Sequence, residues 1–200
     1  ELKALLQTKK NLILQGAPGV GKTYSAKRLA YAMMGAKDDS RIKIIQFHQN
    51  YSYEDFIMGY KPNDTGGFEL KDGVFYDFCK KAAQDPDNKY FFIIDEINRG
   101  NMSKIFGELL QLIEVDYRNH PIKLAYNNQD FAVPANVYII GMMNTADRSL
   151  AMIDYALRRR FSFFTMAPAF ELDSFKQHIN TINDQKLNKL INKVIELNKA

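Results

Sequence analysis

Five short apolar runs recur along the chain, each rich in Ile, Leu, Phe or Val. They cover residues 11–15, 42–47, 90–95, 137–143 and 161–165. Short runs without polar alternation are typical of strands that are buried on both faces, as in a parallel sheet. The pattern therefore predicts a parallel sheet built from these five runs.

Helical spacing appears between the runs. Apolar residues recur at about i, i+3, i+4 and i+7 within 26–33, and a similar spacing follows the third run within 105–113. Strands that alternate with helices predict an α/β layered fold with right-handed crossovers.

Two insertions interrupt this alternation. Residues 61–75 contain two short arms, at 68–70 and 74–75, with Asp72-Gly73 between them as a turn, which predicts a hairpin. Residues 122–133 predict a second hairpin, with its turn at Asn127-Asn128. Both should project from the sheet and be available for contacts, although plain decorated loops explain the same patterns.

The character of the sequence changes near Glu171. Residues 171–182 and 185–199 have helical spacing, and no strand-like run follows them. We expect an α/β core at 1–169 and the truncated beginning of a helical lid subdomain at 170–200. The chain also begins without an initiator Met, so we expect it to be a piece of a longer protein.

A glycine-rich motif, Gly-Ala-Pro-Gly-Val-Gly-Lys-Thr, follows the first run and precedes a helical segment. In this context the pattern GxxxxGK[ST] predicts a nucleotide phosphate site, because backbone N–H groups and the amino end of a helix face the anion. Lys22 is expected to reach the β- and γ-phosphates and Thr23 to bind Mg²⁺. The alternative is an ordinary glycine-rich turn. The predicted nucleotide-binding residues are Gly16, Ala17, Pro18, Gly19, Val20, Gly21, Lys22, Thr23 and Tyr24.

An acidic pair, Asp95-Glu96, ends the third run. At the carboxyl end of a parallel strand, Asp95 is expected to hold Mg²⁺, usually through water. Glu96 is expected to orient and deprotonate an attacking water, which predicts hydrolysis rather than transfer to a second substrate.

Polar residues also end the fourth run. Asn144 is expected to hydrogen-bond the attacking water or the γ-phosphate, unless it only closes the strand in an Asx turn. Asp147 and Arg148 follow in the same loop, and spacing alone leaves their roles open between the site and a subunit boundary.

Three consecutive arginines, Arg158, Arg159 and Arg160, precede the fifth run. Because Lys22 and Mg²⁺ already serve the phosphates of one chain, we expect an arginine to act in trans on a neighbour's γ-phosphate. Arg160 is the first candidate and Arg159 the second. A solvated basic edge or a contact with a phosphate backbone is the alternative.

Composition narrows the class of protein. A hydrophobic fraction of 46% with 25% charged residues is typical of a soluble globular chain. The net charge of +4 argues neither for nor against contact with DNA. The chain lacks an apolar run of about 18 residues and a secretion signal, so we expect a cytoplasmic protein without a membrane partner. The single cysteine, Cys79, is expected to be buried and inert.

Together, the motifs resemble the AAA+ superfamily of P-loop NTPases and, within it, the McrB-type GTPases of methylcytosine-dependent restriction. The resemblance covers about residues 11–170, and MNTADR is its sharpest part. The matching motifs are GAPGVGKT (16–23), FFIIDEINRGNMSKIFGELL (91–110), MMNTADRSL (142–150) and DYALRRRF (154–161).

That resemblance implies a hexameric ring that hydrolyses GTP, is stimulated by an McrC-like nuclease subunit and moves along DNA. It also implies a sensor role for Asn144 and trans-acting arginines among 158–160. Residues that recognise methylated bases are not expected in this chain. The expected preference for GTP over ATP rests on the resemblance alone, since the phosphate loop touches only phosphates. A MoxR-like ATPase that remodels proteins and a nucleotide-gated scaffold are the two alternatives.

Overall fold

A computed structural model describes residues 2–145 and 158–197 of the chain. Its centre is a five-stranded parallel sheet in the order β2-β5-β8-β1-β9. The strands are β1 (Asn11–Gly16), β2 (Ile42–Gln46), β5 (Tyr90–Asp95), β8 (Val137–Asn144) and β9 (Ser162–Met166). Each of the five predicted runs therefore forms a strand of one sheet.

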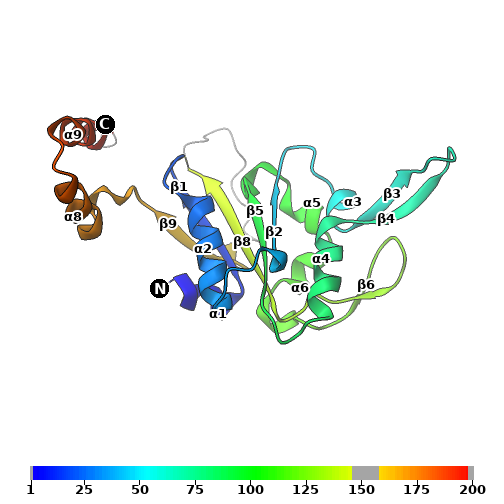
Figure 1. Ribbon diagram of the computed structural model, residues 1–200. Helices are drawn as coiled ribbons and strands as arrows, with labels where there is room; N and C mark the ends of the chain where they lie inside the picture. Colours follow the sequence, from blue (N-terminus) through cyan, green and yellow to red (C-terminus); the bar gives the residue numbers. More distant parts are fainter. Residues whose placement is uncertain (1, 146–157, 198–200) are drawn as a thin grey trace.

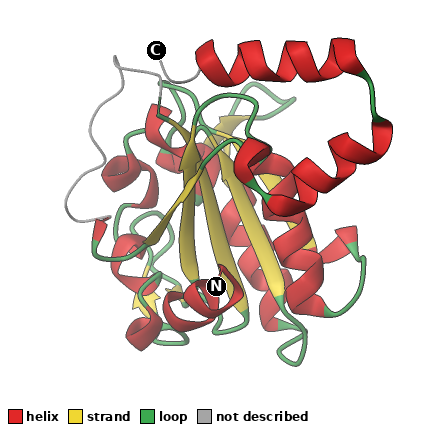
Figure 2. Ribbon diagram, turned by 90° about the vertical axis from the view of Figure 1, so that its left-hand side faces the viewer, coloured by secondary structure: helices red, strands yellow, loops and turns green. Residues whose placement is uncertain are grey.

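Helices cover both faces of this sheet (Figure 1). On one face lie α1 (Leu2–Lys9) and α2 (Lys22–Met34), and on the other lie α4 (Val74–Ala83), α5 (Met102–Phe106) and α6 (Leu109–Leu112). The strands lie side by side between the two helical layers (Figure 2). The predicted α/β layered architecture is confirmed.

Successive residues of each strand enter two different cores. Leu12 and Leu14 pack with α2 residues such as Leu29, whereas Ile13, between them, packs into the core on the other face. A strand with both faces covered buries every side chain, which explains why the runs are continuously apolar. The edge strands β2 and β9 are exceptions, because neither has a fully buried residue, and Ile44 of β2 is exposed.

The first insertion is a hairpin, but its turn is not where the sequence suggested. Its arms are β3 (Met58–Pro62) and β4 (Phe68–Asp72), paired antiparallel. The turn lies at 63–67, where Asn63 Oδ1 accepts hydrogen bonds from the backbone N–H groups of Thr65 and Gly67. The prediction of a turn at Asp72-Gly73 was wrong, because Gly73 is the N-cap of α4 and residues 74–75 begin that helix.

The second insertion forms the predicted hairpin, with arms β6 (Ile122–Lys123) and β7 (Asp130–Phe131). The helical pattern at 105–113 is divided into α5 and α6, because Gly107 adopts φ 49° and ψ −129° and ends the first helix. Another short helix, α3 (Tyr53–Phe56), precedes β3.

Two helices end the described chain, α8 (Asp173–Ile182) and α9 (Gln185–Leu197), as the spacing predicted. Single 3₁₀ turns lie at Asp39–Arg41, Ile97–Arg99, Val115–Tyr117 and Ala169–Glu171. Among the described residues, no helix combines the length and apolar character needed to cross a membrane.

Candidate active site

The glycine-rich loop joins the end of β1 to the start of α2. Gly19 and Gly21 have φ of 82° and 85°, a left-handed conformation that glycine adopts without a Cβ clash. At Gly16, a Cβ would lie 2.5 Å from the backbone oxygen of Met166, so glycine lets β9 approach. Gly21 gives α2 no side-chain cap, which leaves the N–H groups of the first helical turn for an anion.

Lys22 lies inside this loop, with its side chain largely buried. Its Nζ donates hydrogen bonds to the backbone oxygens of Gly16 and Ala17, at 3.0 and 2.9 Å, and to Oδ1 of Asn144 at 2.6 Å. Burial lowers the pKa of Lys22, and the nearby carboxylates of Glu96 and Asp95 oppose that shift. The ammonium is therefore fixed at the mouth of the phosphate loop.

The acidic pair ends β5 at the same edge of the sheet. Oδ1 of Asp95 accepts a 3.0 Å hydrogen bond from the backbone N–H of Glu96. Glu96 adopts φ 50° and ψ 44°, a left-handed conformation that costs a non-glycine residue about 1–2 kcal/mol. Such local strain is characteristic of functional sites.

Asn144 connects the lysine and the glutamate. Its Nδ2 donates to Oε1 of Glu96 at 2.6 Å, while its Oδ1 accepts from Lys22. The sheet order explains this contact, because β8 lies between β1 and β5, ends level with β1 and extends past the end of β5. Lys22, Asp95, Glu96 and Asn144 therefore lie together as one cluster.

A fifth residue, Arg99, joins this cluster, and the sequence analysis missed it. Its Nε lies 3.3 Å from Oε2 of Glu96. The sequence does place Arg99 three residues after Glu96, just past a predicted strand. That spacing alone could not show that the residues after Glu96 form a 3₁₀ turn.

Thr23 and Asp95 remain the candidate ligands of a magnesium ion. Thr23 is exposed in the first turn of α2, and the half-buried Asp95 lies near enough to act on the charge of Lys22. The described residues contain no group of three or more His, Cys, Asp or Glu side chains that could hold a metal. A hydroxyl and one carboxylate fit Mg²⁺, which keeps several waters and binds substrate phosphates as further ligands.

The described arginines of the 158–160 segment lie at the opposite edge of the sheet. Arg160 is buried, and its Nη2 lies 2.8 Å from Oε1 of Glu114. The side chain of Arg159 is 64% exposed, and its Nη2 is 3.9 Å from the same oxygen. Because Met166 pairs with Gly16, Arg160 lies six residues, about 20 Å, from the level of the phosphate loop. Neither side chain reaches the phosphate site of its own chain.

Three other predicted residues stand apart from the cluster. Tyr24 is exposed on α2, where the guanidinium of Arg28 lies 5.4 Å from its ring centroid. Asp147 and Arg148 lie outside the described residues.

A buried polar network supports the amino edge of the sheet, and it also escaped the sequence analysis. Arg118 Nη2 donates to Oδ1 of Asn11 at 2.8 Å, and Asn11 Nδ2 donates to the backbone oxygens of Ile113 and Arg160. Burial lowers the pKa of Arg118 to about 10. The network fixes the segment that carries the arginines, so its role is structural.

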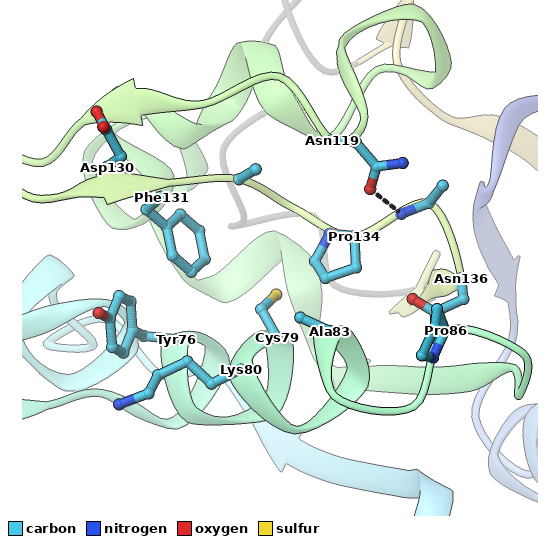
Figure 3. Close-up of a pocket in the computed structure, with 12 residues that line it drawn as sticks. Tyr76, Cys79, Lys80, Ala83, Pro86, Asn119, Asp130, Phe131, Pro134 and Asn136 are labelled. Atoms are coloured by element: carbon cyan, nitrogen blue, oxygen red, sulfur yellow. Dashed lines mark hydrogen bonds between the residues drawn. The ribbon is translucent and has the colours of Figure 1, made fainter.

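One pocket lies away from this cluster, between α4 and residues 130–136, with a volume of about 540 Å³ (Figure 3). The side chains of Tyr76 and Cys79 face Phe131 and Pro134 across it. It reaches Asn136 at the amino end of β8, whereas Asn144 is at the carboxyl end. Cys79 is buried as expected, and burial raises the pKa of its thiol, which keeps the thiol protonated and unreactive.

Comparison with known proteins agrees with this geometry. The model of the AAA domain, dynein-related subfamily, matches residues 11–161. The Escherichia coli type IV methyl-directed restriction enzyme EcoKMcrB subunit is 58% identical over 179 residues, which cover 87% of this chain and 39% of that protein. The Bacillus subtilis type II restriction enzyme BsuMI component YdiS is 26% identical over 228 residues, which cover 94% of this chain and 65% of that protein.

Thus the chain spans less than two thirds of the length of either relative. A crystal structure from Cytophaga hutchinsonii, described as a candidate ATPase, superposes with a TM-score of 0.50 and 18% identity. That superposition covers 91% of this chain and 50% of the other, and at this identity it supports the fold alone.

Proposed function

This chain belongs to the dynein-related subfamily of AAA domains and is an AAA+ protein of the McrB type, and from that premise we propose that it hydrolyses nucleoside triphosphates. The observation that carries the proposal is the link through Asn144, which joins the amine of Lys22 to the carboxylate of Glu96. One side chain thus contacts both the group that binds phosphate and the group that activates water.

In this mechanism the phosphate loop and Lys22 bind the triphosphate, and Glu96 takes one proton from a water. The water oxygen bonds to the γ-phosphorus as the bond to the β,γ-bridging oxygen breaks, which releases a nucleoside diphosphate and phosphate. Thr23 and Asp95 would hold Mg²⁺, which neutralises charge on the β- and γ-oxygens. Asn144 keeps Glu96 in place.

A scaffold that only binds nucleotide needs neither a fixed glutamate nor its strained backbone. Glu96 is largely buried, with its side chain 12% exposed, and is held on Oε1 by Asn144. Burying a carboxylate costs free energy that hydrogen bonds and charge pairing must offset, and a chain that only bound nucleotide would not need a carboxylate held in this way. The environment of Glu96 therefore favours hydrolysis over the scaffold.

We further propose that the chain is the motor module of an McrBC-like DNA restriction system and uses GTP in preference to ATP. Both relatives named above are components of restriction enzymes, which favours this role over MoxR-like remodelling of proteins. Guanine preference rests on the resemblance of MNTADR (143–148) to the GTP-using branch. An McrC-like nuclease subunit and DNA are the proposed partners, and residues 170–200 are assigned to the beginning of the helical lid subdomain.

Ring formation, with a hexamer as the proposed state, gives the arginines their function. An arginine of the 158–160 segment cannot reach the phosphates of its own chain, so it would have to serve a neighbour. The exposed guanidinium of Arg159 is better placed for this than Arg160, which is buried against Glu114. The proposal therefore shifts from Arg160 toward Arg159.

The test is a titration of the chain with GTP and with ATP, each with Mg²⁺, that follows binding, phosphate release and assembly state. Glu96→Gln should bind nucleotide and release no phosphate, and Lys22→Ala should lose binding. GTP-selective assembly supports the restriction role, whereas ATP selectivity supports the remodeller. Full turnover by Glu96→Gln would remove Glu96 from its role.

A further inference from the structure

The two carboxylate oxygens of Glu96 have different surroundings. Oε1 accepts the 2.6 Å hydrogen bond from Asn144. Oε2 is buried and accepts no hydrogen bond from any residue that the structure describes. Solvent does not reach Oε2 in this conformation, so the orientation of the Glu96 carboxylate depends on the groups packed against it. A carboxylate in a fixed orientation is what general-base catalysis requires.

Arg99 is the positive group beside that oxygen. Its Nε lies 3.3 Å from Oε2, close enough for an ion pair but outside hydrogen-bond geometry. The 3₁₀ turn fixes this approach, because the backbone N–H of Arg99 donates to the backbone oxygen of Glu96 at 2.8 Å. The guanidinium therefore holds the carboxylate by charge on the side of Oε2.

We propose that Arg99 is a positioning residue for hydrolysis, which together with Asn144 holds the Glu96 carboxylate in the orientation that takes the proton of the attacking water. Asn144 fixes one oxygen by a hydrogen bond, and Arg99 fixes the direction of the other by charge. This inference rests on the proposed hydrolysis and adds a residue to it. Arg99 acts through Glu96 and within the same chain.

Removing Arg99 should affect turnover much more than folding. The side chain of Arg99 is 45% exposed, and ion pairs with an exposed partner contribute little to stability. Without the guanidinium, Glu96 keeps its bond to Asn144, but its carboxylate can rotate out of the orientation in which it takes the proton. Because general-base catalysis contributes about 10²–10⁴-fold, a misdirected base should lose at least about tenfold.

The experiment compares Arg99→Ala, Arg99→Lys and a matched control, Arg41→Ala. Arg41 forms the same kind of pair, with Nε 2.7 Å from Oδ2 of Asp38 three residues earlier, but away from the active site. We expect kcat for GTP to fall about tenfold or more in Arg99→Ala, with KM and Tm nearly unchanged. Arg99→Lys should recover part of the loss, and Arg41→Ala should keep the normal kcat.

A mixing experiment separates action within one chain from action on a neighbour. Chains with Arg99→Ala are mixed with chains carrying Glu96→Gln. If Arg99 serves its own Glu96, every site in the mixture lacks one of the two groups, and activity stays at the level of the variants. Recovery of activity on mixing would overturn the inference, because it would place Arg99 in the neighbour's site.

Failure of this inference is distinct from failure of the proposed function. Normal kcat in Arg99→Ala, with Glu96→Gln inactive, would overturn the role of Arg99 and leave hydrolysis intact. Equal loss of Tm in Arg99→Ala and Arg99→Lys would show a structural role instead. Absence of nucleotide hydrolysis by the unsubstituted chain would overturn the proposed function itself.

Discussion

The Nζ atom of Lys22 lies 2.6 Å from Oδ1 of Asn144, so the lysine proposed to bind phosphate is already held by a residue of the neighbouring strand. A bound γ-phosphate would compete with this amide oxygen for the same ammonium. Asn144 also holds Glu96, and the exchange would therefore reach the residue proposed to activate water. In the proposed mechanism, this one side chain connects binding with hydrolysis.

Substitution of Asn144 should separate these two contacts. Asn144→Ala releases Lys22 for phosphate and frees Glu96, so nucleotide affinity should stay within about threefold while kcat falls about tenfold or more. Asn144→Asp keeps the size of the side chain but places a carboxylate against both groups. The new carboxylate should keep the Lys22 ammonium paired, so this variant should bind nucleotide more weakly in addition to losing kcat. Calorimetry and phosphate release measure the two effects, and equal affinities in both variants would contradict this account.

Gly21 and Gly66 form a matched pair of left-handed glycines, with φ of 85° and 81° and open space around each Cβ position. Replacing either by Ala should cost about 1–2 kcal/mol of unfolding free energy, because L-residues disfavour this conformation. Only Gly21→Ala should also weaken nucleotide binding, since that loop must aim its N–H groups at phosphate. Comparable affinities in the two variants, measured by titration, would argue against a phosphate site at this loop.

Substitutions of Arg159 and of Arg160 should differ in their effect on stability and in the activity recovered when variant chains are mixed. Arg160→Ala leaves Glu114 without its 2.8 Å partner and should lower the free energy of unfolding by about 1–3 kcal/mol. Arg159→Ala, with an exposed side chain, should leave Tm nearly unchanged. If Arg159 acts in trans, mixing Arg159→Ala chains with Lys22→Ala chains should restore part of the activity. No recovery on mixing, with both variants folded and assembled, would exclude that role.

The acid sensitivity of the chain should include a contribution from Asp38. Hydrogen bonds from Ser40 and then from Arg41 lower the pKa of Asp38 to about 2. A pKa that is lowered on folding stabilises the native state above the unfolded value, and that stability is lost as pH falls toward the folded value. The difference in Tm between the unsubstituted chain and Asp38→Asn should be constant near neutrality and shrink from about pH 4 to pH 2. A difference that does not change with pH would contradict this assignment.

The hairpin that precedes α4 shows where sequence patterns mislead. Asp72-Gly73 has the composition of a turn, but Gly73 is required for another reason, since a Cβ there would lie 2.4 Å from the backbone of Phe56. A close approach between two segments leaves no local signal. The turn that formed uses Asn63, whose side-chain oxygen accepts two backbone N–H groups.

The sequence by itself determined the sheet, because strands buried on both faces need continuous apolar runs. It also determined the phosphate loop, because glycines and a lysine at this spacing specify the backbone geometry of the loop locally. Only the tertiary structure decided that Lys22, Asn144 and Glu96 form one chain of hydrogen bonds, that Arg99 stands beside Glu96, and that Arg160 is buried against Glu114. These contacts depend on strand order, on a 3₁₀ turn and on side-chain burial, which are set by the packing of distant segments.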